Sequence, residues 1–200
     1  MKMKKIDIAE YLSEALHLRD RQVVDFLEER AVVEPVKKRD QIFVIGKRPE
    51  YVALAVDGVF RAFYVNEDDV EVTDCLVGTP GESLMPGFDL DAPAPATMEA
   101  LTKGAIFKIR LADFRQLMRM SPAVGSIYQD MIQRAGQYHL EKGRVISSYM
   151  AEKKYRWFLE THGDLDNRIP DKYIASYLHM SPVTLSQIKK HLREAEGAEA

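Results

Sequence analysis

The sequence contains a single cysteine, Cys75, among its 200 residues. One cysteine excludes an internal disulfide and every zinc or iron–sulfur site that needs four thiolates, and we expect Cys75 to be a small residue of a buried strand. Long apolar runs are also missing. The basic start MKMKK leads into IDIAEYLSE, which carries three carboxylates instead of a signal-peptide core. These absences predict a cytoplasmic protein with no membrane partner.

Histidine is scarce, and its spacing does not suit metal chemistry. No histidine occurs in residues 31–110, where a metal-binding β-barrel enzyme would need several. The sequence also lacks a glycine-rich phosphate loop and a nucleophile elbow, and it has no carboxylate pair that stands out. It therefore predicts a protein that is not an enzyme and that holds no metal or other cofactor.

The net charge of −3 hides an asymmetry along the chain. Residues 31–110 carry 9 Lys+Arg against 13 Asp+Glu, whereas residues 149–193 carry 8 against 5. A basic excess confined to one part of a chain is typical of a segment that contacts nucleic acid.

Residues 31–110 alternate between β-rich runs and turn residues. Strands are predicted at 51–56, 59–65, 70–77, 97–101 and 105–110. The dipeptide Asp57-Gly58 between the first two predicts a β-hairpin. Short antiparallel strands at this spacing indicate a β-roll, preceded by one or two amphipathic helices at 6–30.

Residues 169–192, IPDKYIASYLHMSPVTLSQIKKHL, have the pattern of a helix-turn-helix. Apolar residues recur where two crossing helices must bury them, and small Ala175 permits a close crossing. Ser181-Pro182 is a typical start for the second helix. The apolar positions are Ile174, Leu178, Met180, Leu185 and Ile188. His179 stands where a turn glycine is usual.

The second helix then has a polar outer face that could enter a major groove of DNA. The 100° step per residue turns Val183, Ser186 and Gln187 outward as base-reading candidates. Polar and basic residues around them suit contacts with the DNA backbone. These are Arg168, Lys172, Ser181, Lys189, Lys190 and Arg193. The alternative is a helical hairpin with a solvated face.

Residues 111–148 are expected to form a short helix and then a long one that starts at Ser121-Pro122. An apolar stripe at spacings of three, four and seven runs along the long helix. It consists of Val124, Ile127, Met131, Tyr138 and Val145. We interpret the stripe as a homodimer seam. Since Arg134 and Glu141 fall in the same seam, the alternative is a helix packed against its own β-roll.

The order of these parts resembles the Crp/Fnr family of bacterial transcription regulators. The most specific passages are YVALAVDGVFRAFYVNEDDVEVTDCLVGTPGE, LADFRQLMRMSP and IPDKYIASYLHMSPVTLSQIKKHL. The resemblance implies an α+β chain with a sensor roll (1–110), a dimerisation helix (111–148) and a C-terminal winged helix-turn-helix (149–200). It also implies a homodimer whose partners are promoter DNA and RNA polymerase.

The family's cyclic-nucleotide site is degenerate in this sequence. Gly81 and Glu82 match its Gly-Glu pair, but its Arg-Ser-Ala step falls on Ala94, Pro95 and Ala96. The phosphate-binding arginine is therefore absent, and a proline removes an N–H donor. No Lys or Arg lies between Gly81 and Lys103. We expect a DNA-binding regulator that cyclic nucleotides do not control, with an unidentified effector or none. The alternative function is a ligand-binding or interaction protein that keeps a degenerate helix-turn-helix.

Overall fold

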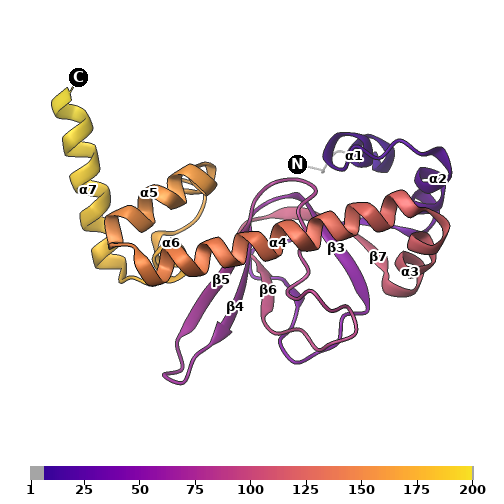
Figure 1. The fold of residues 1–200 in the computed structure, drawn as a ribbon, viewed down its shortest axis with the longest axis horizontal. Coiled ribbons are helices and arrows are strands. Elements are labelled where there is room, and N and C mark those ends of the chain that lie inside the picture. The colour runs from indigo at the N-terminus through magenta and orange to yellow at the C-terminus, as the bar shows by residue number, and fades with distance from the viewer. Residues whose placement is uncertain (1–6, 200) are drawn as a thin grey trace. The chain divides into compact units, whose positions relative to one another are not determined.

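The computed structural model describes residues 7–199 (Figure 1). Internal contacts divide the chain into two units. The first holds residues up to 62 together with 77–134, and the second holds 63–76 together with the residues from 135 onward. The expected boundaries at 110 and 148 do not follow this division, because residues 63–76 pack with the C-terminal part of the chain.

The strands form the two sheets of an antiparallel β-roll, which confirms the expected fold class. One sheet has the order β1 (Val32–Val36), β7 (Gly104–Arg110), β3 (Tyr51–Asp57). The other has the order β2 (Gln41–Phe43), β6 (Thr97–Ala100), β4 (Phe60–Val65), β5 (Glu71–Val77). Neither β1 nor β2 is predicted from the sequence, because β1 contains Glu34 and Pro35 and β2 has only three residues.

The hairpin predicted at Asp57-Gly58 is wrong. Strands β3 and β4 belong to different sheets, so this dipeptide is the corner at which the chain passes from one to the other. Gly58 has φ +102°, and a Cβ there would lie 3.1 Å from Gly104 Cα. The register between β3 and β7 also shifts between Ala55 and Asp57. Asp57-Gly58 does form a turn. A β-bulge in β3 and the close approach of Gly58 to Gly104 direct the chain into the other sheet instead of back along β3.

Two N-terminal helices cover the first sheet. Helix α1 (Ile8–Ala15) begins at Asp7 and α2 (Arg21–Arg30) at Asp20, and each aspartate accepts hydrogen bonds from two backbone amides of its helix. The buried hydroxyl of Tyr11 donates to the Ala55 carbonyl at 2.8 Å. These contacts anchor the helices on a core that includes side chains of β3 and β7.

The helices α3 (Leu111–Met120) and α4 (Pro122–Ser148) match the expected pair. The stripe predicted as a dimer seam on α4 is partly buried within its own chain. Val124 is buried in the core of the first unit, against which Ile127 and Met131 also pack. Tyr138 and Val145 are buried or half-buried in the second unit, Val145 with 2% exposure. Val124 and Val145 therefore favour the alternative, a helix packed on its own chain, and the homodimer seam stays a prediction.

Three further helices follow: α5 (Ala151–His162), α6 (Asp171–Tyr177) and α7 (Pro182–Glu199), with a short 3₁₀ turn at Gly163–Leu165. Within residues 149–199 the structure contains no strand, so the wing that the family resemblance implied does not form there. The helix-turn-helix itself consists of α6 and α7.

Candidate nucleic-acid interface

The turn between α6 and α7 has the geometry that its sequence predicted. His179 adopts the left-handed conformation with φ 51°, and the Met180 amide donates to the Ala175 carbonyl at 3.0 Å. The Ser181 hydroxyl accepts a hydrogen bond from the Thr184 amide at 3.0 Å, which caps α7. A histidine therefore fills the usual glycine position, at the cost of left-handed strain.

The buried face of the motif positions α7 on α6. Ile174, Ala175, Leu178 and Leu185 have no exposed surface. Because Ala175 has only a methyl group, α7 can cross closely over α6. Met180 and Ile188 are half-buried.

The opposite face of α7 is open to solvent. Val183 is 66% exposed, and Ser186, Gln187 and Lys190 are also exposed. The structure therefore brings the three base-reading candidates to one face of the first two turns of α7. An apolar methyl pair, a hydroxyl and an amide there could contact base edges.

Several of the backbone-contact candidates are exposed around this face. Arg168 is paired with Asp164 at 3.2 Å, and Lys190 lies 3.7 Å from Glu194. The Lys172 ammonium lies over the Tyr173 ring at 4.7 Å. Such exposed pairs are weak, so these cations can exchange a carboxylate for a phosphate. Arg193 and Ser181 are exposed as well.

Lys189 is placed differently from the expectation. It is only 8% exposed, and its ammonium lies 2.8 Å from Asp166 Oδ1 and 2.7 Å from Asp171 Oδ1. Asp166 also accepts a hydrogen bond from the Tyr155 hydroxyl at 2.9 Å, and burial raises the pKa of Tyr155. We therefore reassign Lys189 from a phosphate contact to the packing of the domain. Its position four residues after Leu185 and three before Leu192 indicates the buried face and could have shown this.

The residues of the degenerate effector pocket serve the turns of the roll. Glu82 Oε2 accepts hydrogen bonds from the amides of Gly78 and Thr79, so this carboxylate caps its own turn. Ala94 is buried, and its carbonyl accepts a hydrogen bond from the Gly46 amide of a neighbouring loop at 2.8 Å. Pro95 is exposed.

The helix α1 packs tightly against the first residue of this pocket. Gly81 has φ +86°, and a Cβ there would meet the Ala15 carbonyl at 2.9 Å. A glycine at this position is thus explained by packing alone.

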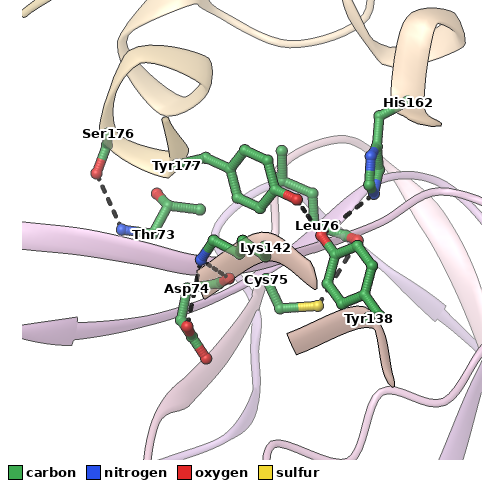
Figure 2. A network of polar contacts seen from close by, with 9 residues as sticks. All are labelled: Thr73, Asp74, Cys75, Leu76, Tyr138, Lys142, His162, Ser176 and Tyr177. Carbon is green, nitrogen blue, oxygen red and sulfur yellow. Dashed lines mark hydrogen bonds and ion pairs between the residues drawn. The ribbon is translucent and has the colours of Figure 1, made fainter. Parts of the chain in front are cut away.

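A polar cluster that sequence reasoning missed joins β5, α4, α5 and α6 in the second unit (Figure 2). The Tyr138 and Tyr177 hydroxyls share a hydrogen bond, and His162 Nε2 lies 3.5 Å from the Tyr138 hydroxyl oxygen. Burial lowers the pKa of His162, whose ring stacks on Phe158. Lys142 is buried beside Tyr177. The residues come from distant segments, and no local pattern joins them.

The described residues 7–199 contain no group of three or more metal-binding side chains, and none of their helices has the length and hydropathy needed to cross a membrane.

Several solved structures share the fold. FixK2 from Bradyrhizobium japonicum superposes with a TM-score of 0.73 at 16% identity, over 83% of this chain and 86% of that one. The c-di-GMP-responsive global regulator CLP of Xanthomonas campestris gives 0.68 at 15%, over 89% and 93%. The Thermus thermophilus catabolite activator protein gives 0.55 at 19%, over 93% and 88%. No family model and no curated protein matches the chain. The chain thus has the fold of Crp/Fnr regulators.

Proposed function

We propose that this protein is a sequence-specific DNA-binding transcription regulator that acts as a homodimer on promoter DNA, with RNA polymerase as a further partner. The observation that carries the proposal is the exposed face of α7, where Val183, Ser186 and Gln187 stand beside a capped and well-buried helix-turn-helix. The Ser181 cap fixes the start of α7, and the buried face of the motif leaves these three side chains together in solvent.

Binding to DNA selected from random sequence tests the proposal. A dimer that neutralises roughly six to ten phosphates should show log affinity falling with log salt at about −0.9 per contact. Absence of DNA binding at low salt would instead favour the alternative, an interaction protein with a degenerate motif.

The sequence preference should lean toward A·T pairs. Gln187 can bond adenine N6 and N7 together, and Val183 offers methyl groups to a thymine methyl. We expect Gln187→Ala to cost about 1–3 kcal/mol on the selected site and to relax discrimination at one base pair. Fluorescence anisotropy on matched and singly substituted sites measures both.

Ser186→Ala is the matched control, because this exposed neighbour is expected to be tolerant. A Gln187→Ala variant with full discrimination, or a selected half-site rich in G·C, would contradict the assignment of Gln187.

We also expect the protein to ignore cyclic AMP and cyclic GMP. Glu82 caps its own turn, and Ala94 and Pro95 stand where a phosphate-binding arginine would be needed. Calorimetric titration with millimolar nucleotide should give no saturable heat. Saturable binding would show that the roll holds an anion without that arginine.

Because the predicted seam packs partly within its own chain, we propose that the homodimer contact extends to the exposed side of α4. Gly136, Leu140 and Gly143 share one helix face at spacings of four and three. Leu140 is 77% exposed, and a Cβ at either glycine would meet no neighbouring atom within 4 Å. Small residues beside an exposed leucine let a second α4 approach closely.

Leu140→Glu should therefore convert the dimer to a monomer, because the partner helix would have to bury a carboxylate. Light scattering after size-exclusion chromatography measures the mass. Ala123→Glu adds the same charge at another exposed position of α4 and should leave the dimer intact. A Leu140→Glu protein that stays dimeric would move the interface elsewhere.

A further inference from the structure

The segment 63–76, the acidic hairpin formed by the outer part of β4 and most of β5, is bonded to the helix-turn-helix. Ser176 on α6 accepts a hydrogen bond from the Thr73 amide at 2.9 Å and donates one to the Glu71 carbonyl at 3.2 Å. Strand β5 lies at the edge of its sheet, and this one hydroxyl bonds two of its backbone groups. Figure 2 shows the Ser176 side chain pointing at Thr73.

A buried lysine holds the same strand from α4. The Lys142 ammonium donates to the Asp74 carbonyl and lies 3.3 Å from Asp74 Oδ1, while the Tyr177 ring lies 4.7 Å from it. Lys142 is 5% exposed and Thr73 has no exposed surface. Thr73, Asp74, Lys142 and Ser176 together form what we call the hairpin clamp.

The clamp places the hairpin beside the start of α7. A groove between them is lined by Tyr64, Asn66 and Glu71 on one side and by His179, Met180 and Ser181 on the other. These last residues are the turn and the N-cap that a bound DNA backbone would approach.

The charge of the hairpin opposes that approach. Residues 62–102 contain no Lys or Arg, and the hairpin itself carries Glu67, Asp68, Asp69, Glu71 and Asp74. Glu67, Asp68 and Asp69 are exposed at its tip, where Asn66 organises the turn through its own carboxamide oxygen. Of these carboxylates Glu71 lines the groove itself, and the exposed tip residues add to the negative potential around it, which repels phosphates.

We propose that the acidic hairpin is an intramolecular brake on DNA binding, held against the helix-turn-helix by the hairpin clamp. This inference rests on the proposed function. DNA binds the released form better than the clamped form, because only release removes the carboxylates from the side of α7. The free energy needed to release the hairpin from the clamp therefore makes the free energy of DNA binding less favourable by the same amount.

Two variants test the brake independently. Ser176→Ala removes both hydrogen bonds to β5 and should raise DNA affinity by about fivefold or more, a typical coupling for two states. The triple variant Glu67→Gln, Asp68→Asn and Asp69→Asn leaves the clamp intact, removes the repelling charge and should also raise affinity. Its control is Asp25→Asn, Glu28→Gln and Glu29→Gln on α2, which changes the net charge equally and should have a smaller effect.

Hydrogen exchange of the Thr73 amide reports release without DNA. The Thr73 amide should be protected from exchange in the wild-type protein and should lose this protection in the Ser176→Ala variant. Unchanged protection would overturn the clamp. Lost protection with equal or weaker DNA affinity would overturn the brake. If neither the unchanged protein nor any variant binds DNA while Thr73 still loses protection, the proposed function fails and the clamp stands.

Discussion

Lys189→Ala is expected to destabilise the second unit by about 3 kcal/mol, the lower end of the range for breaking a buried ion pair. The variant leaves Asp166, whose side chain is 13% exposed, without its ammonium partner. Asp171 is 46% exposed and can be rehydrated, which is why the lower end applies. Urea unfolding followed by Trp157 fluorescence measures the loss, because this tryptophan belongs to the same unit.

The adjacent Lys190 is the matched control. Its side chain is 78% exposed and lies 3.7 Å from Glu194, so Lys190→Ala should change the free energy of unfolding by under about 0.5 kcal/mol. It should instead reduce the magnitude of the salt slope of DNA binding by about 1.8, because the homodimer loses one phosphate contact from each of its two chains. If the Lys189→Ala and wild-type proteins are equally stable, the ion pairs of Lys189 do not stabilise the domain, and Lys189 is again a candidate for a phosphate contact.

Gly104→Ala is expected to destabilise the β-roll by about 3 kcal/mol. The added Cβ would lie 2.8 Å from both Asp57 C and Gly58 Cα, and these are backbone atoms that cannot rotate away. Relief requires the corner between the two sheets to shift, which strains the packing of β3 on β7. Thermal unfolding followed by circular dichroism measures the effect.

Gly163→Ala makes the corresponding control in the second unit. Gly163 is helical, with φ −59° and ψ −28°, and a Cβ there meets nothing within 4 Å. Alanine should be neutral or slightly stabilising. A tolerated Gly104→Ala would mean that the corner yields more easily than its close contact indicates.

Local chemistry explains which features could be predicted from the sequence. The Ser181-Pro182 start and the left-handed His179 depend on residues within a few positions of one another. Their outcome is nearly independent of the rest of the chain. The buried set of the helix-turn-helix is equally local, since one helical period defines it.

The errors arose where a local pattern allows two outcomes. An Asp-Gly turn can close a hairpin or turn a corner, and here the corner packs closely against Gly104, far along the chain. An apolar stripe can face a second copy or its own core, and for Val124 the core of the first unit decides. Ser176 bonds a strand 103 residues away, which no spacing rule could predict.

The two halves of α4 are each committed to a different core, Val124 to the first unit and Val145 to the second. A single inserted residue between Met131 and Tyr138 would rotate every later side chain by 100° about the helix axis relative to the earlier ones. Each half of the helix would keep its own core, and only the phase between the two buried faces of α4 would change. The number of residues between these anchors therefore sets the phase between the two buried faces of α4, and seven residues, close to two turns, is the smallest insertion that nearly restores it.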